Sequence, residues 1–225
     1  MTASHYVHAL ALSLDPAWRR HERDERCRTA EEFCAAVSTR SDVTTFTYSM
    51  VGLRAGTDLL LWSLSPSLES LEVKGAAALR MGMGAWMTVR HSFLGIIRPS
   101  QYVKRPTAQE QSLFSGDRSR YLVVYPFTKS TEWYLLDQEE RQRVMNEHMK
   151  VGHRYRQVRQ LLAYSFGVDD MDFLVAYETD DLPAFGELVR QLRGTESRTS
   201  TVRDTPILTA IHRPIEDITR LLGAE

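Results

Sequence analysis

The sequence predicts an α+β fold in which one chain carries two copies of a β-α-β-β-α-β unit. Strand-like and helical patterns follow one another in the same order in residues 5–97 and again in residues 121–212. Short segments also match between the two halves, as expected for a duplicated unit. The matching pairs are YSMVG at 48–52 with YSFG at 164–167, DLLL at 58–61 with DFLV at 172–175, and Leu-Arg at 79–80 with Leu-Arg at 192–193.

The first half begins with residues 5–14, in which apolar residues alternate with small or polar ones as in a strand. Asp15 and Pro16 then suit the N-cap and the first position of a helix that runs to about Ser38. The remaining elements of this half are strands at 44–51 and 58–64 around a glycine-bearing turn, a helix from Ser65-Pro66 to about Leu79, and a strand at 88–97.

The second half starts with a strand at 121–127. Asp137, with Glu140 three residues later, forms a capping box at the start of a long helix. Strands at 164–166 and 172–177, a helix at 181–192 and a strand at 206–212 complete the repeat. This unit is ferredoxin-like.

Two such units in one chain predict a dimeric ferredoxin-like α+β barrel. We assign residues 1–100 to the N-terminal half, residues 101–120 to a linker and residues 121–225 to the C-terminal half. Barrels of this kind enclose a cavity of ligand size, so we expect a small-molecule site.

Composition excludes several classes of protein. The 28 basic and 29 acidic residues give a net charge of −1, which argues against a broad nucleic-acid surface. Cys27 and Cys34 are too few for a disulfide framework or a structural zinc site. No signal peptide or membrane-spanning run is recognisable, so we expect a cytoplasmic protein with no nucleic-acid or membrane partner.

The long helix carries an apolar stripe with a histidine in its middle. The stripe consists of Val144, His148, Val151, Tyr155, Val158 and Leu162, at steps of four and three. A histidine in this position is either a hydrogen-bonded core residue or a ligand, and periodicity leaves both open. A single histidine as the only protein ligand would suit haem iron, because the porphyrin supplies the other four nitrogens.

Residues 125–134, YPFTKSTEWY, combine redox-capable aromatic side chains with a lysine that could bind a carboxylate. The same residues would also fit the aromatic end of a strand with a surface lysine, and composition leaves both interpretations open.

Three long segments make the second half recognisable. They are YPFTKSTEWYLLDQEERQRVMNEHMKVGHRY, AYSFGVDDMDFLVAYETDDLPAFGELVRQLRGTE and RDTP. Over residues 121–212 the chain resembles the chlorite dismutase-like family and, within it, the coproheme decarboxylases. The YPF and EWY segments resemble the actinobacterial and thermophile branches.

The resemblance implies roles for individual residues. His148 would be the proximal haem ligand, and Glu196 the carboxylate that hydrogen-bonds it. Tyr125 would be the redox-active tyrosine beside a propionate, Lys129 would contact a propionate, and Trp133 would line the haem cavity. The implied cofactor or substrate is a non-covalent iron porphyrin, either haem b or coproheme.

The chain departs from the family pattern around the second axial position. Chlorite dismutases carry an arginine about thirteen residues after the proximal histidine, where this chain has Leu161, preceded by Gln160. Actinobacterial members have a distal histidine in the linker, which here holds Gln109 and Gln111 but no histidine. Two further sites differ, with His153 where some decarboxylases have arginine and Arg198 where they have serine. We nevertheless place His153, Gln160 and Leu161 beside the porphyrin.

The resemblance implies a peroxide-dependent enzyme that converts two propionates of coproheme to vinyl groups, giving haem b, with Tyr125 passing an oxidising equivalent to the propionate. The missing distal arginine argues against chlorite decomposition. A haem protein with peroxidase-like or specialised oxidase activity, or a non-catalytic haem-binding member, remains an alternative. Family members form rings, commonly pentamers, so we expect a homo-oligomer.

Overall fold

The computed structural model describes residues 5–39, 41–98 and 117–225. Most of the predicted linker, including Gln109 and Gln111, lies outside these residues. The chain divides into two compact units, the first formed by Met1–Ile97 with Thr209–Glu225 and the second by Arg98–Leu208. Residues 209–225, which we assigned to the C-terminal half, therefore pack with the first unit.

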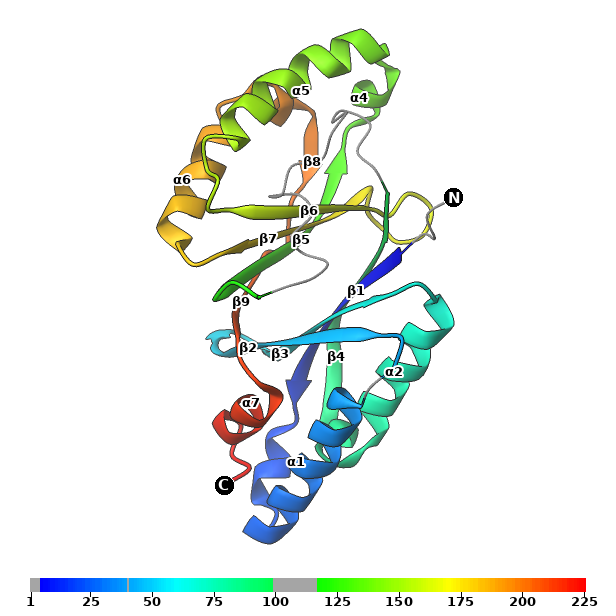
Figure 1. Cartoon of the computed structure of the whole chain (residues 1–225), viewed down its shortest axis with the longest axis vertical. Coiled ribbons are helices and arrows are strands. Elements are labelled where there is room, and N and C mark those ends of the chain that lie inside the picture. The colour runs from blue at the N-terminus through cyan, green and yellow to red at the C-terminus, as the bar shows by residue number, and fades with distance from the viewer. Residues whose placement is uncertain (1–4, 40, 99–116) are drawn as a thin grey trace. The chain divides into compact units, whose positions relative to one another are not determined.

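The first unit is an antiparallel sheet built from β1 (His5–Leu14), β2 (Thr44–Arg54), β3 (Thr57–Ser65) and β4 (Met87–Ile97). Its strands lie in the order β4-β1-β3-β2, and β9 (Leu208–His212) pairs with β2 through Tyr48 and His212. Helices α1 (Arg23–Ser38), α2 (Leu68–Arg80) and α7 (Ile215–Leu221) belong to this unit (Figure 1). Contacts of α7 with α1 and β2 explain why the C-terminal segment joins this unit.

The core of the first unit lies between the sheet and its helices. Leu10, Leu12 and Leu14 alternate along β1 and are all buried, as a strand with one face on a core requires. Trp18 and Phe33, each at most 1% exposed, pack into the same cluster.

The second unit holds β5 (Tyr121–Lys129), β6 (Arg159–Tyr164), β7 (Phe173–Thr179) and β8 (Thr201–Arg203), all paired antiparallel in the order β6-β7-β5-β8. Its described helices are α4 (Thr131–Leu135), α5 (Gln138–Gly152) and α6 (Leu182–Leu192), and the 3₁₀ turn η3 (Glu196–Ser200) follows α6. The longest described helix, α1, has 16 residues, and none of the described helices is long and apolar enough to cross a membrane.

Strand register assigns the residues of this sheet to two faces. Tyr125 and Leu162 both lie opposite Val175, and Gln160 lies opposite Tyr177, so all five share one face. This is the face that α5 and α6 cover, because its residues form one apolar cluster with helical ones. The cluster contains Tyr125, Phe127, Val151, Tyr155, Val158, Phe173, Val175, Tyr177, Phe185, Leu188 and Leu192.

The long helix is shorter than its apolar stripe predicts. Helix α5 ends at Gly152, so Val158 lies in the loop before β6 and Leu162 lies within β6. The strand predicted at 164–166 is instead β6 at 159–164, and α4, η3, β8 and α7 have no counterpart in the prediction. The helix predicted from Asp15 to Ser38 begins as a separate 3₁₀ turn, Pro16–Arg20, before α1.

Candidate functional site

His148 sits on α5, whose start is fixed by the predicted cap: the Asp137 carboxylate accepts the Glu140 backbone N–H at 2.8 Å. Its Nδ1 lies 3.0 Å from Ser197 Oγ on η3, while its Nε2 makes no hydrogen bond with any described residue. Burial and the nearby Lys129 ammonium lower the pKa of His148 to about 4. The ring is therefore neutral at pH 7, and Nε2 is free to bind a metal.

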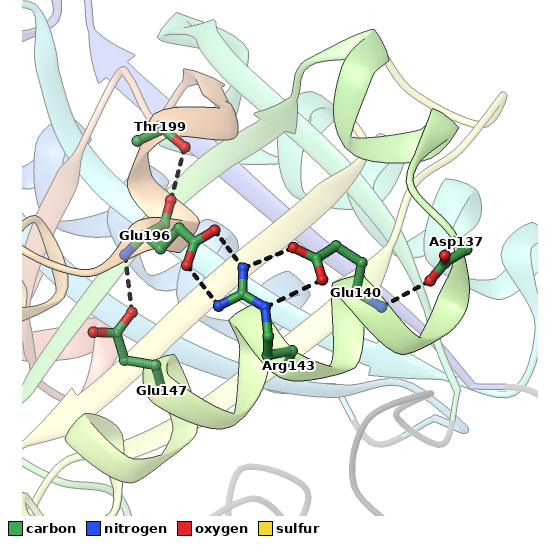
Figure 2. Close-up of polar contacts among 6 residues, drawn as sticks. All are labelled: Asp137, Glu140, Arg143, Glu147, Glu196 and Thr199. Carbon is green, nitrogen blue, oxygen red and sulfur yellow. Dashed lines mark hydrogen bonds and ion pairs between the residues drawn. The ribbon is translucent and has the colours of Figure 1, made fainter.

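Glu196 does not contact His148. Its carboxylate oxygens pair with the two terminal nitrogens of Arg143 at 2.6 and 2.9 Å, and its backbone N–H donates to Glu147 at 3.0 Å (Figure 2). The resemblance made Glu196 the hydrogen-bond partner of His148, but in this structure the neighbouring residue Ser197 makes that contact.

Lys129, at the end of β5, is a buried ammonium group without a carboxylate partner in the described part of the chain. Its Nζ donates to the Ser197 carbonyl at 2.5 Å and lies 4.4 Å from the centroid of the buried Trp133 ring. Burial, together with the charge of Arg198, lowers the pKa of Lys129 to about 8. A buried cation in such surroundings could bind an anion.

Tyr125 lies on the helix-covered face of the sheet, stacked on Tyr177 with ring centroids 6.1 Å apart and hydrogen-bonded to it. Burial and the contact with Tyr177 raise the pKa of Tyr125 well above its ordinary value. The phenol therefore keeps its hydrogen at neutral pH, which is the form a hydrogen-atom donor must have.

The three remaining predicted residues fall in different places. Gln160 shares the face of Tyr125, directly opposite Tyr177. Leu161, one residue on, points to the other face and is 4% exposed. His153 is an exposed residue at the C-terminal end of α5. The structure thus groups Gln160, but neither Leu161 nor His153, with Tyr125.

Charges of both signs surround the site. Asp204 pairs with Arg198 at 2.5 Å and with Arg193 at 3.8 Å, and Asp204 and Arg193 both act on the pKa of Tyr125. Asp172 accepts the backbone N–H of Lys129 at 2.7 Å. Of the three cations, only Lys129 has a side chain without a carboxylate partner among the described residues. Arg193 at the end of α6 and Ser197 in η3 were not predicted as site residues, because no periodicity or spacing in the sequence marks them.

Comparison with known proteins identifies the family of the chain. The family model described as "Chlorite dismutase" matches residues 23–213. A protein of Mycolicibacterium smegmatis named "Coproheme decarboxylase" is 30% identical over 178 residues, which cover 76% of this chain and 74% of that protein.

Solved chlorite dismutases of Candidatus Nitrospira defluvii have the same fold. A mutant form superposes with a TM-score of 0.90 at 26% identity, covering 100% of this chain and 97% of its own. The imidazole complex superposes with a TM-score of 0.88 at 27% identity, covering 98% and 95%. The predicted fold class is confirmed by this likeness, and the chain belongs to the chlorite dismutase family.

Proposed function

We propose that the protein is a coproheme decarboxylase, which uses hydrogen peroxide to convert two propionates of iron-coproporphyrin III to vinyl groups and releases haem b. The observation that carries the proposal is the position of Lys129. Its buried ammonium donates to the carbonyl of Ser197, the residue whose hydroxyl contacts His148. Ser197 therefore contacts both Lys129, which would bind an anion, and His148, the candidate iron ligand.

The side chains present fit an iron porphyrin. His148 offers an imidazole nitrogen with no competing hydrogen bond among the described residues, and Lys129 offers a buried charge that lacks a counter-ion there. The apolar helix-covered face of the sheet supplies surface for a flat macrocycle, and Trp133 lies beside Lys129. When bound, the porphyrin iron supplies activation of peroxide and one-electron oxidation.

The chain's own residues bind and orient the substrate. Lys129 holds one propionate carboxylate by a charge-assisted hydrogen bond. Tyr125, four residues earlier on β5 and on the same face, holds a phenolic hydrogen that can be removed and restored near the propionate β-carbon. For each group the balance is one propionate anion, one hydrogen peroxide and one proton giving one vinyl group, one carbon dioxide and two waters.

Gln160 is the residue that we propose for the peroxide side of the site. Its side chain shares the face of Tyr125 and Tyr177, and an amide can donate a hydrogen bond to peroxide without carrying a charge. A chlorite dismutase-type arginine at this place would bring a fixed charge that the amide lacks. This difference favours peroxide chemistry over chlorite decomposition.

The test is a titration of the coproheme complex with hydrogen peroxide, with product masses measured at each addition. We expect two successive losses, each of carbon dioxide and two hydrogens. Tyr125→Phe should bind coproheme normally and lose neither group, because phenylalanine keeps the ring but has no phenolic hydrogen. Tyr121→Phe, on the same strand, is the matched control and should behave as the parent protein.

Three outcomes would contradict the proposal. Full-rate conversion by Tyr125→Phe would remove the tyrosine from the reaction. Bleaching of the parent complex without any vinyl product would favour the alternative of a peroxidase-like or oxidase haem protein. No change in the absorption spectrum on adding coproheme or haem b would favour a member of the family that does not bind haem.

A further inference from the structure

A chain of hydrogen bonds runs from His148 to the C-terminal end of α6. His148 Nδ1 lies 3.0 Å from Ser197 Oγ, and Ser197 Oγ lies 3.0 Å from Thr195 Oγ1. Thr195 Oγ1 in turn lies 2.7 Å from the carbonyl oxygen of Leu192. Ser197 and Thr195 are 4% and 6% exposed, so water does not compete for these hydroxyls.

The end of this chain sets the direction of every bond in it. A carbonyl oxygen only accepts, so Thr195 must donate its one hydroxyl hydrogen to Leu192. Thr195 Oγ1 then accepts from Ser197, which uses the only hydrogen of that hydroxyl. Ser197 Oγ is left as an acceptor towards His148, and His148 Nδ1 must carry the hydrogen.

Side chains on α5 hold η3 in place for this contact. Glu147 accepts the backbone N–H of Glu196, and the next residue, His148, contacts the next residue, Ser197. Arg143 binds the Glu196 carboxylate from one turn earlier on the same helix (Figure 2). Two successive residues of η3 are therefore matched to two successive residues of α5.

We propose that Ser197 and Thr195 are positioning residues that fix His148 in the Nδ1–H tautomer before any porphyrin binds. The lone pair is then on Nε2, the atom with no hydrogen-bond partner among the described residues, and points away from Ser197. The role of that lone pair rests on the proposed function, because it is the group that would bind iron. The tautomer itself is a property of the porphyrin-free chain.

The test is ¹⁵N NMR of porphyrin-free protein labelled at histidine, at pH 7.5, with the His148 signals identified by their absence from His148→Gln. We expect the parent protein to show His148 with hydrogen on Nδ1, although a free imidazole prefers Nε2–H. Thr195→Val removes the acceptor of the Ser197 hydroxyl, which can then donate to Nδ1. The tautomer should therefore shift towards Nε2–H in this variant.

Controls separate this effect from a loss of structure. Thr195→Ser keeps the hydroxyl and should keep the Nδ1–H form. Thr199→Val, in the same turn, removes a hydroxyl whose only partner among the described residues is the Glu196 carbonyl, and this variant should also keep the Nδ1–H form. In Thr195→Val the Leu192 carbonyl still accepts the backbone N–H of residue 195 at 3.1 Å, so the turn remains bonded to α6.

An Nε2–H tautomer in the parent protein, or an unchanged tautomer in Thr195→Val, would overturn the proposal. A second readout is the iron-histidine band in resonance Raman spectra of the coproheme complex, which should shift in Thr195→Val and stay unchanged in Thr199→Val. If NMR shows the Nδ1–H form but coproheme gives no iron-histidine band, the proposed function fails while the tautomer assignment stands.

Discussion

Replacing Lys129 with methionine should stabilise the porphyrin-free protein and weaken porphyrin binding at the same time. Methionine has a similar length and shape but no charge, so it fills the same space beside Trp133. Lys129 is 9% exposed as a residue, and its ammonium makes no ion pair with the described residues. Such a group lowers stability until an anion binds to it.

The size of the effect follows from the pKa of Lys129, which burial lowers from 10.5 to about 8. A shift of that size corresponds to about 3 kcal/mol between the charged and neutral forms. Loss of the charge-assisted hydrogen bond to the Ser197 carbonyl offsets roughly 1.5 to 3 kcal/mol. We therefore expect the Lys129→Met variant to be more stable at pH 7 by up to about 1.5 kcal/mol.

The sign of the pH dependence is fixed by the same shift. Between the folded pKa of about 8 and the unfolded value of 10.5, the unfolded chain binds more protons at Lys129 than the folded chain does. The free energy of unfolding of the parent protein should therefore rise with pH across this window, and the penalty is fully present below it. Lys129→Met should lack this rise.

Urea denaturation at pH 7 and pH 10 measures both quantities, with Lys150→Met as the control at an exposed lysine of α5. Coproheme affinity, measured by absorption titration, should fall roughly 10- to 100-fold in Lys129→Met, because a charge-assisted hydrogen bond is worth about 1.5 to 3 kcal/mol. A variant less stable than the parent at pH 7, or one with unchanged affinity, would refute this reasoning.

Three further predictions concern His148 and the adjacent residues Gln160 and Leu161 of β6. His148→Ala should abolish the iron-histidine band of the coproheme complex, whereas the exposed His153→Ala should retain it; a band that survives in His148→Ala would show that another residue binds iron. Gln160→Leu should slow peroxide consumption by about 10²-fold with unchanged coproheme affinity, as expected for loss of one preorganised hydrogen-bond donor. Leu161→Ala should instead lower the free energy of unfolding in urea by about 2 to 5 kcal/mol and leave turnover intact. Slow turnover at normal stability in Leu161→Ala would reverse the assignment of the two faces.

Several helix starts are predictable because the residue before the helix caps it. Asp15, Asp137 and Asp181 each precede a helical turn, and each carboxylate accepts a backbone N–H two or three residues later. The capping box at Asp137 forms only in part, because Glu140 pairs with Arg143 instead of reaching back to the cap. Caps thus locate helix starts even where a competing ion pair takes one of the side chains.

The length of α5 is not predictable from its apolar stripe, because the last step of the stripe fits both the helix period and the strand period. Val158 and Leu162 are four residues apart, which is close to one helical turn and also two full repeats of a strand. Both periods therefore place these residues on one face. The strand period applies here, and it turns Gln160 towards the helices and Leu161 away from them.

The hydrogen-bond partner of His148 also differs from the expected one by a single position in the sequence. The resemblance identifies a carboxylate, Glu196, as the partner of His148, yet Arg143 occupies both oxygens of that carboxylate and Ser197 makes the contact. A carboxylate partner pulls on the imidazole hydrogen and strengthens the ring as an electron donor. The Ser197 hydroxyl, which donates its hydrogen to Thr195, only accepts from His148 and leaves the imidazole neutral. The environment of the histidine is therefore set by hydroxyl direction, which depends on the contact between η3 and α6 and is not encoded in any spacing along the sequence.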